Sequence, residues 1–342
     1  MLSALESVGS NAWGVLAYPD ALGVADEQAR VRPVVPRRPT LLEFHGGWLI
    51  DELMLARRLS GSVFHATDPR RIPKGVKAVV ATVYDLTPLD DAAVWDRLWP
   101  DQRAAYRRAV ERLRRADALI AISGTVAHQL QDRLGVEPEA IHIVYPALGD
   151  VTPLSNLPSR DRADQLLFVG APDPHKNLDV LLNALASIPA AQRPPLTVVG
   201  PWAPSAITKL RRDTRRLGLT EPSVHAFVTR DDLEDLYRAA AVLVLPSRHE
   251  GFGLPLVEAM ARGVPVIASD LPVLREVAGK AALYVPVGDH GALATAIQRT
   301  LGDASERRRR SVDGLVRARQ FSPENALRSL LSAYRSVGIE LN

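Results

Sequence analysis

Two glutamates, Glu250 and Glu258, flank a Gly-Phe-Gly-Leu-Pro sequence. Pro255 suits the first position of a helix, because proline is preorganised there and has no N–H to leave unpaired. Glu258 would then lie roughly 4–5 Å further along the helix axis. Gly251 and Gly253 let the backbone approach a ligand closely and point N–H groups at it. Two acids beside such a helix start suit a ligand with both phosphates and vicinal hydroxyls, which is the chemistry of a nucleotide sugar.

Either glutamate alone is equally well explained as a favourable partner of the helix dipole. The longer string changes the balance: Glu-Gly-Phe-Gly-Leu-Pro is followed by Glu-Ala-Met-Ala from Glu258 and by Gly-Val-Pro-Val-Ile-Ala-Ser from Gly263. This string resembles the retaining GT-B glycosyltransferases of family 4. The Tyr-Asp-Leu-Thr-Pro segment from Tyr84 and the Lys176-Asn177 pair resemble bacterial mannosyltransferases among them. The resemblance implies an α/β fold of two Rossmann-like, doubly wound parallel-sheet domains that face a cleft. It also implies transfer of a hexose, with retention, from a nucleotide-diphosphate sugar to a hydroxyl acceptor.

The resemblance assigns roles to the residues of this loop. Glu250 is expected to bind the hydroxyls of the donor sugar and to be catalytic, and Glu258 to bind the ribose hydroxyls. Backbone amides between them would contact sugar and phosphate. The other donor-binding candidates of the loop are Arg248, Gly251, Phe252, Gly253 and Leu254.

A second anion site is predicted where an apolar run, Leu166 to Val169, ends in Gly170 before a helix. Such loops bind anions in doubly wound sheets. The resemblance makes Lys176 the contact to the donor diphosphate and a catalytic residue, whereas alone it reads as a solvated surface lysine. The family's usual neighbouring arginine is absent here, so Arg248 is the candidate to replace it.

Three further positions complete the candidate site. The segment around Tyr84 and Asp85 resembles the family's His-Asp segment, with Tyr84 in place of the histidine that borders the transferred sugar. Asp85 is expected to orient the acceptor or to stiffen the loop. Val228 follows an apolar run and is a candidate for the base pocket or an ordinary turn. His65 resembles a cleft residue of the family, although a structural role is favoured.

Alternating apolar runs and helical patterns predict a parallel sheet in each half. We expect an acceptor-side domain at residues 1–150, a nucleotide-sugar-binding domain at 151–321, and a helix at 322–342 that crosses back to the first domain. In the first half the expected strands are Gly14–Tyr18, Val63–Ala66, Ala78–Thr82, Ala118–Ile122 and Ile141–Tyr145, and the expected helices are Trp48–Leu59, Trp95–Arg115 and Thr125–Leu134, the last capped by Ser123. In the second half the expected strands are Leu166–Gly170, Leu196–Gly200, His225–Val228, Val242–Leu245, Pro265–Ala268 and Ala282–Val285. Because Met1–Val8 resembles the family's first helix, its opening strand and Gly-rich loop are expected to be missing.

Composition sets the wider limits. The chain has 342 residues, 46% hydrophobic and 24% charged, and no cysteine, as expected for a two-domain globular protein of the reducing cytoplasm. Its apolar runs are too short to cross a bilayer. Arginine clusters fall on helices with interleaved acids, so we expect solvated faces and no nucleic-acid partner. Contact of the first domain with the inner face of an acidic membrane is expected if the acceptor is a lipid.

The sequence contains no Asp-x-Asp and no cluster with metal-ligand spacing, so we expect no metal and no cofactor. The donor is expected to be the nucleotide sugar, with GDP-mannose favoured, and the acceptor a glycan, a lipid-linked saccharide or a small molecule. Two alternatives remain open. They are an inactive donor-binding partner subunit of a glycosyltransferase and a GT-B sugar-nucleotide epimerase.

Overall fold

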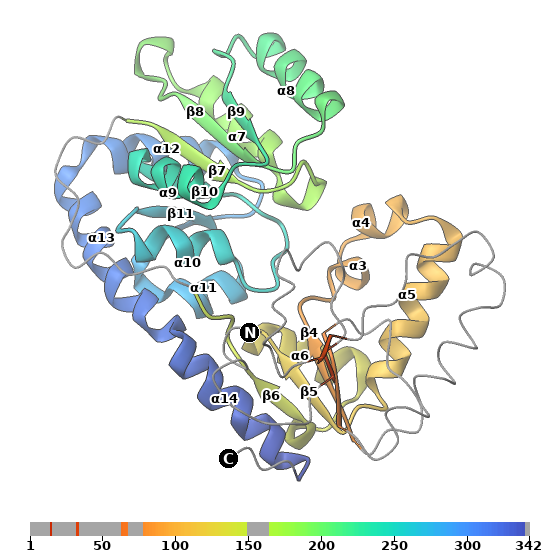
Figure 1. The fold of residues 1–342 in the computed structure, drawn as a ribbon. Coiled ribbons are helices and arrows are strands. Elements are labelled where there is room, and N and C mark those ends of the chain that lie inside the picture. The colour runs from red at the N-terminus through yellow and green to blue at the C-terminus, as the bar shows by residue number, and fades with distance from the viewer. Residues whose placement is uncertain (1–13, 16–31, 34–62, 68–77, 149–163, 339–342) are drawn as a thin grey trace. The chain divides into compact units, whose positions relative to one another are not determined.

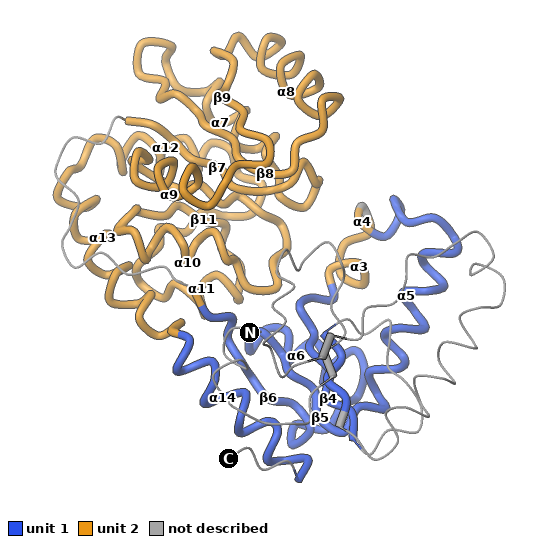
Figure 2. Tube along the Cα trace, in the orientation of Figure 1, with its two compact units in different colours: residues 1–86, 95–147, 323–342 blue, residues 87–94, 148–322 orange. Residues whose placement is uncertain are grey.

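The computed structural model describes residues 14–15, 32–33, 63–67, 78–148 and 164–338. These residues form two compact units (Figure 2): residues 1–86, 95–147 and 323–342 in unit 1, and residues 87–94 and 148–322 in unit 2. The helices predicted at Met1–Val8 and Trp48–Leu59 lie outside the described residues. The prediction that the family's opening strand and Gly-rich loop are missing also concerns residues outside them. Nowhere in the described ranges does a helix reach the length and apolarity that a membrane span needs.

Unit 1 is built on a parallel sheet with the strand order β2-β1-β3-β4-β5-β6. The strands are β1 (Gly14–Val15), β2 (Arg32–Pro33), β3 (Val63–Ala66), β4 (Ala78–Val83), β5 (Ala118–Ala121) and β6 (Ile141–Ile143). Every residue of β4 and β5 is buried. Continuous burial explains why Thr82 is the one polar residue of these two strands, since a central parallel strand is covered on both faces.

The helices of this half depart from the predicted pattern at one place. A single helix over Trp95–Arg115 is wrong: α4 (Ala92–Arg97) ends before Trp99, and α5 (Pro100–Leu113) begins anew. The cause is Pro100, which lacks the N–H that a continuous helix needs and fits a first helical position. A short helix that the sequence did not predict, α3 (Thr87–Asp90), precedes α4. The predicted cap of α6 (Gly124–Leu134) is confirmed, because Ser123 Oγ accepts a hydrogen bond from Val126 N at 3.1 Å.

The last helix, α14 (Pro323–Ser336), packs against β5 and β6 within unit 1. A buried polar contact joins it to the sheet: the Tyr334 hydroxyl lies 2.6 Å from His65 Nδ1, and His65 Nε2 lies 2.8 Å from Thr82 Oγ1. Burial lowers the pKa of His65 to about 4, so the ring is neutral at pH 7. His65 therefore has the structural role that was favoured.

Unit 2 contains a second parallel sheet, ordered β12-β11-β10-β7-β8-β9 (Figure 1). Its strands are β7 (Leu166–Val169), β8 (Leu196–Gly200), β9 (Ser223–Ala226), β10 (Val242–Leu245), β11 (Val266–Ser269) and β12 (Ala282–Val285). Five of them lie within a residue of their predicted bounds, but β9 ends two residues before the predicted Val228. The reason is Phe227, whose φ of 56° takes the chain out of the extended region before Thr229 caps the next helix.

Besides α3, unit 2 contains the helices α7 (Leu178–Ser187), α8 (Pro204–Arg216), α9 (Arg230–Ala239), α10 (Leu254–Ala261), α11 (Pro272–Ala278), α12 (His290–Gly302) and α13 (Ala304–Ala318). Apolar side chains of α7 and α12 join those of the sheet strands in one buried core. This core fixes the strand ends from which the candidate site extends.

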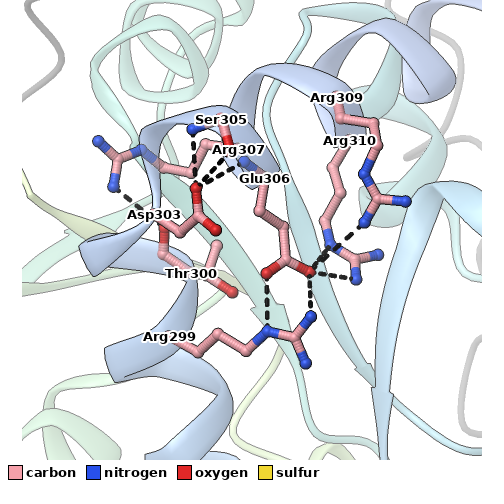
Figure 3. A network of polar contacts seen from close by, with 8 residues as sticks. All are labelled: Arg299, Thr300, Asp303, Ser305, Glu306, Arg307, Arg309 and Arg310. Atoms are coloured by element: carbon pink, nitrogen blue, oxygen red, sulfur yellow. Dashed lines mark hydrogen bonds and ion pairs between the residues drawn. The ribbon is translucent and has the colours of Figure 1, made fainter.

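A charged cluster holds α12 to α13 (Figure 3). The carboxylate of Glu306 is almost fully buried and accepts hydrogen bonds from Arg299 at 2.7 and 3.0 Å and from Arg310 at 2.7 and 3.1 Å. Asp303 caps α13 by accepting from the backbone of Glu306 at 3.0 Å. Glu306 thus bonds to one guanidinium group from each helix, so the cluster stabilises the helix pair.

Candidate active site

The strand order of unit 2 places two loops at a topological switch point. From β7 the chain adds β8 and β9 on one side, and from β10 it adds β11 and β12 on the other, so β7 and β10 are neighbours. In open parallel sheets, ligands bind beyond the carboxyl ends of the strands at this point. The loop after β7 carries Gly170 and Lys176, and the loop after β10 carries Glu250.

Lys176 and Glu250, each predicted from its own loop, form an ion pair across the switch point. The Lys176 ammonium donates to Glu250 Oε1 at 2.8 Å, and the two side chains are 19% and 7% exposed. Ser247 Oγ donates to the same oxygen at 2.7 Å. The pair lies at the protein surface yet is mostly shielded from water, which strengthens its electrostatic interaction relative to an exposed pair.

Asn177 ties the two loops together behind this pair. It has a φ of 56°, a left-handed conformation that asparagine tolerates better than most residues, and it is 3% exposed. Its amide donates to Pro246 O at 3.1 Å, and its side-chain oxygen accepts from Arg248 Nε at 3.2 Å. Arg248 N also donates to His175 O at 2.7 Å. Arg248 is thus held beside the Lys176 loop. A residue that takes the place of the family's usual arginine must lie there.

Gly170 lies at the end of β7, but its backbone groups are already engaged. Its N–H donates to Val199 O at 2.8 Å, and its carbonyl accepts from the Trp202 indole at 2.9 Å. A side chain on Gly200 would place its Cβ 2.3 Å from the Gly170 carbonyl oxygen, so this approach requires glycine at 200. In this conformation Gly170 fixes the loop against β8, and its N–H is not available to a phosphate.

The turn from β10 into α10 is set by Gly253, which has a φ of 92°. A Cβ there would also lie 2.7 Å from Leu274 Cδ2. The helix begins at Leu254, so Pro255 is its second residue and not its first as predicted. The Phe252 ring is 3% exposed and packs edge-on against Phe321 at 5.4 Å between centroids. Only the backbone of Phe252 is therefore positioned to contact a ligand, while the Leu254 side chain is exposed.

Glu258, on the first turns of α10, has different partners from Glu250. Its Oε2 accepts from the Tyr237 hydroxyl at 2.6 Å, and its backbone carbonyl accepts from Arg262 at 2.8 Å. Arg262 pairs instead with Glu234 at 2.5 Å and lies 4.7 Å from the centre of the Tyr237 ring. Burial raises the pKa of Glu258, and the hydrogen bond from Tyr237 and the charge of Arg262 oppose that rise.

The other predicted residues lie elsewhere. Val228 is half-buried in the loop between β9, the outer strand of the sheet, and α9. Tyr84 and Asp85 are exposed residues that follow β4 in unit 1. Their roles toward the donor and acceptor stay predictions. A surface hollow of about 490 Å³ between α7 and α8, lined in part by Lys209 and Asp213, contains none of the predicted residues.

Sequence reasoning missed Ser247, Tyr237 and the structural role of Asn177. Ser247 directly follows Pro246 at the end of β10. Its place just before the string that resembles family 4 was the sequence signal that could have identified it. Tyr237 lies on α9, where its spacing reads only as part of the buried face of a helix. Nothing in the sequence indicates that its hydroxyl meets Glu258.

Two family models match the chain. Residues 163–303 match the group 1 glycosyl transferases, and residues 15–148 match Glycosyltransferase Family 4. Each half of the chain therefore matches a glycosyltransferase family, and the chain belongs to the glycosyltransferases of the GT-B fold.

Curated relatives and solved structures agree. The chain is 37% identical over 173 residues to the O-antigen chain mannosyltransferase B of Escherichia coli, covering 49% of this chain and 45% of that protein. It is 33% identical over 309 residues to a D-inositol 3-phosphate glycosyltransferase of Geodermatophilus obscurus, covering 83% of this chain and 66% of that protein. The chain thus spans about half to two thirds of the length of these relatives.

Among solved structures, the sucrose-phosphate synthase of Thermosynechococcus elongatus superposes with a TM-score of 0.74 at 21% identity, over 98% of this chain and 91% of that chain. Anabaena HepE, solved in complex with UDP and glucose, superposes with a TM-score of 0.71 at 17% identity, over 91% of this chain and 88% of that chain. At these identities the likeness establishes the fold.

Proposed function

We propose that this protein transfers a hexose, with retention and without a metal, from a nucleotide-diphosphate sugar to a hydroxyl acceptor. The observation that carries the proposal is the Lys176–Glu250 pair, 2.8 Å apart at the switch point of the sheet. It joins a cation suited to a diphosphate with an acceptor group suited to sugar hydroxyls. Relatives named as mannosyltransferases and the structural neighbour solved with UDP and glucose support the donor class.

In this proposal each candidate site residue of unit 2 has a distinct task. Lys176 stabilises charge on the departing diphosphate, aided by Arg248 and by amides of the β10–α10 turn. Glu250 accepts hydrogen bonds from the hydroxyls of the hexose, and Glu258 accepts those of the ribose. Val228 and the loop around it border the base. The protein thus supplies position and electrostatic stabilisation.

Transfer takes place on one face of the sugar. The bond between C1 and the donor phosphate oxygen breaks, and that oxygen takes the proton of the acceptor hydroxyl. The acceptor oxygen then bonds to C1 on the face that the phosphate left, so the anomeric configuration is kept. Asp85 is proposed to orient the acceptor and Tyr84 to border the hexose.

GDP-mannose is the favoured donor, because several relatives that the chain matches are named as mannosyltransferases. The acceptor is proposed to be a glycan, a lipid-linked saccharide or a small molecule such as an inositol phosphate. We place the reaction in the cytoplasm, with contact to the inner face of the membrane where the acceptor is a lipid. Basic side chains of the first unit would favour such contact with anionic lipids.

The test is release of nucleoside diphosphate from GDP-mannose, UDP-glucose and ADP-glucose, with a mannose-terminated glycan and D-inositol 3-phosphate as acceptors. Lys176→Met should lower kcat/KM on the order of 100-fold. The matched control is Lys209→Met, which removes an exposed lysine that also pairs with a carboxylate at 2.8 Å, and it should keep full activity. Proton NMR should show an unchanged anomeric configuration in the product, and EDTA should not reduce the rate.

Three results would contradict the proposal. Equal activity in Lys176→Met and Lys209→Met would show that Lys176 does not stabilise the departing diphosphate. An inverted product would remove the retaining step. Donor binding without any nucleotide release would make the protein a donor-binding partner subunit, the alternative in which it is inactive.

A further inference from the structure

The hydroxyl of Tyr237 makes a short hydrogen bond to one oxygen of Glu258. Tyr237 comes from α9, is 0% exposed, and donates to Glu258 Oε2 at 2.6 Å. Such a length is typical of hydrogen bonds to an ionised carboxylate. The carbonyl of Pro255 lies further from this hydroxyl, at 3.4 Å, so Glu258 is its main partner.

The surroundings fix the phenol in place without neutralising the carboxylate. The Arg262 guanidinium lies 4.7 Å from the centre of the Tyr237 ring. Its ionic partner is Glu234, at 2.5 Å, and it donates to the backbone carbonyl of Glu258 at 2.8 Å. Among the described residues, no side chain donates to Glu258 Oε1. Glu258 therefore has one oxygen held by a neutral donor and a second oxygen open to a ligand.

We propose that Tyr237 is a positioning residue for the ribose of the nucleotide. Its hydroxyl holds Glu258 Oε2, so that Oε1 accepts the ribose hydroxyls and the site prefers ribonucleotides to deoxyribonucleotides. The inference rests on the proposed function, because it needs a nucleotide beside Glu258.

A neutral partner suits this task better than a cation does. A lysine or arginine would satisfy the carboxylate and compete with the weaker hydrogen bonds of the ribose. A phenol occupies one oxygen and leaves the charge in place. Burial raises the pKa of Glu258 and the Tyr237 hydrogen bond lowers it, so the hydroxyl also helps to keep Glu258 ionised and able to accept.

The experiment compares Tyr237→Phe with wild type by calorimetric titration of GDP, 2′-deoxy-GDP and 3′-deoxy-GDP, with the matching uridine nucleotides in parallel. Wild type should bind the ribonucleotide roughly 10- to 100-fold more tightly than a deoxy form, as expected for hydrogen bonds to a charged group. Tyr237→Phe should bind the ribonucleotide about tenfold more weakly and the deoxy forms nearly as before.

Two controls separate positioning from a structural role. Tyr284→Phe removes a hydroxyl that donates to Gly279 O at 2.7 Å from a ring that lies 4.5 Å from the Arg275 guanidinium. It should lower the melting temperature without changing the ribose preference. In a Glu258→Gln background, Tyr237→Phe should add almost nothing to the loss, since a residue that acts through Glu258 is not additive with it.

A pH profile gives a further readout. The charged and titratable groups around Glu258 are Tyr237, Arg262 and Glu234. Loss of the Tyr237 hydroxyl raises the pKa of Glu258 further, so Glu258 is protonated at a higher pH. As the pH is lowered, nucleotide binding by Tyr237→Phe should therefore begin to weaken at a higher pH than binding by wild type does.

The possible failures are distinct. Wild type that binds none of the nucleotides overturns both the proposed function and this inference. Wild type that binds nucleotides but ignores the ribose hydroxyls overturns the ribose role of Glu258 and the inference with it. A ribose preference that survives in Tyr237→Phe, or an equal loss for ribo and deoxy forms, overturns this inference alone.

Discussion

Replacing Glu250 with glutamine should tighten the binding of GDP while slowing hexose transfer. The Lys176 ammonium is bonded to Glu250 Oε1 at 2.8 Å. A diphosphate that binds Lys176 must compete with this carboxylate and also meets its negative charge. Glutamine keeps the shape and an oxygen that can accept from Ser247, but it removes the charge. Nucleotide affinity and turnover should therefore move in opposite directions.

The size of the effect follows from the geometry of the pair. At an effective dielectric constant of about 20, two unit charges at this separation attract by about 6 kcal/mol. Exposed pairs contribute about 0–1 kcal/mol net, whereas losing one partner of a buried pair costs roughly 3–5 kcal/mol. With side chains 19% and 7% exposed, this pair lies between the two limits. We expect about 1–2 kcal/mol in favour of GDP, or roughly 5- to 30-fold tighter binding.

The assay is calorimetric titration of GDP and of inorganic pyrophosphate, with kcat measured for GDP-mannose. Turnover should fall on the order of 100-fold, because Glu250 is proposed to hold the hexose in the transition state. Asp213→Asn is the matched control: it removes a carboxylate that pairs with Lys209, also at 2.8 Å, on α8. It should change neither quantity. Weaker or unchanged GDP binding by Glu250→Gln would refute the reasoning that Glu250 competes with the diphosphate for Lys176.

Three other predictions test the surroundings of the site. The pKa of buried His65 is about 4, against 6.5 in an unfolded chain, so the unfolded state binds a proton first as the pH falls. Urea titrations should therefore show the free energy of unfolding of unit 1 falling by about 3 kcal/mol between pH 7 and pH 4, and falling much less in His65→Gln. Gly200→Ala forces a Cβ to within 2.3 Å of a carbonyl oxygen and should destabilise unit 2 by roughly 3 kcal/mol, whereas Gly170→Ala, whose Cβ meets nothing closer than 3.4 Å, should cost under about 1 kcal/mol. Burial raises the pKa of Glu258, so its ionised form lowers the stability of the folded state, and this cost is absent at low pH and grows as the pH rises. Urea titrations should show Glu258→Gln to be more stable than wild type at pH 7.5 and no more stable at pH 4, and an equal gain at both values would contradict this.

The fold was largely predictable from the sequence because central parallel strands are buried on both faces. β10, a fully buried apolar strand inside its sheet, matches its predicted bounds of Val242–Leu245. Predictions were wrong where one residue overrides its neighbours. Pro100 divides a helix whose periodicity continues across it, and Phe227 ends β9 through a local backbone conformation that the apolar pattern does not encode.

The candidate site was predictable only in part, for a related reason. Lys176 and Glu250 were identified separately from loops that follow β7 and β10, and the parallel sheet brings these loops together. Contacts made by side chains at long sequence separation were not predictable. Tyr237 lies on a helix that reads as an ordinary amphipathic one, and only the folded chain places its hydroxyl on Glu258.

The two glutamates of one sequence motif therefore have opposite electrostatic surroundings. Glu250 accepts hydrogen bonds from the Lys176 ammonium and from a serine hydroxyl. An anionic ligand that binds Lys176 in its place therefore leaves Glu250 able to accept hydrogen bonds from sugar hydroxyls. Glu258 accepts from a neutral phenol, and within the described part of the chain no cation forms an ion pair with its carboxylate, so a second neutral donor can bind without displacing a charge. If diphosphate binding is what frees Glu250, then a nucleoside without phosphates should bind beside Glu258 yet fail to loosen the Lys176–Glu250 pair. Addition of GDP, but not of guanosine, should therefore change the ¹⁵N chemical shift of the Lys176 ammonium.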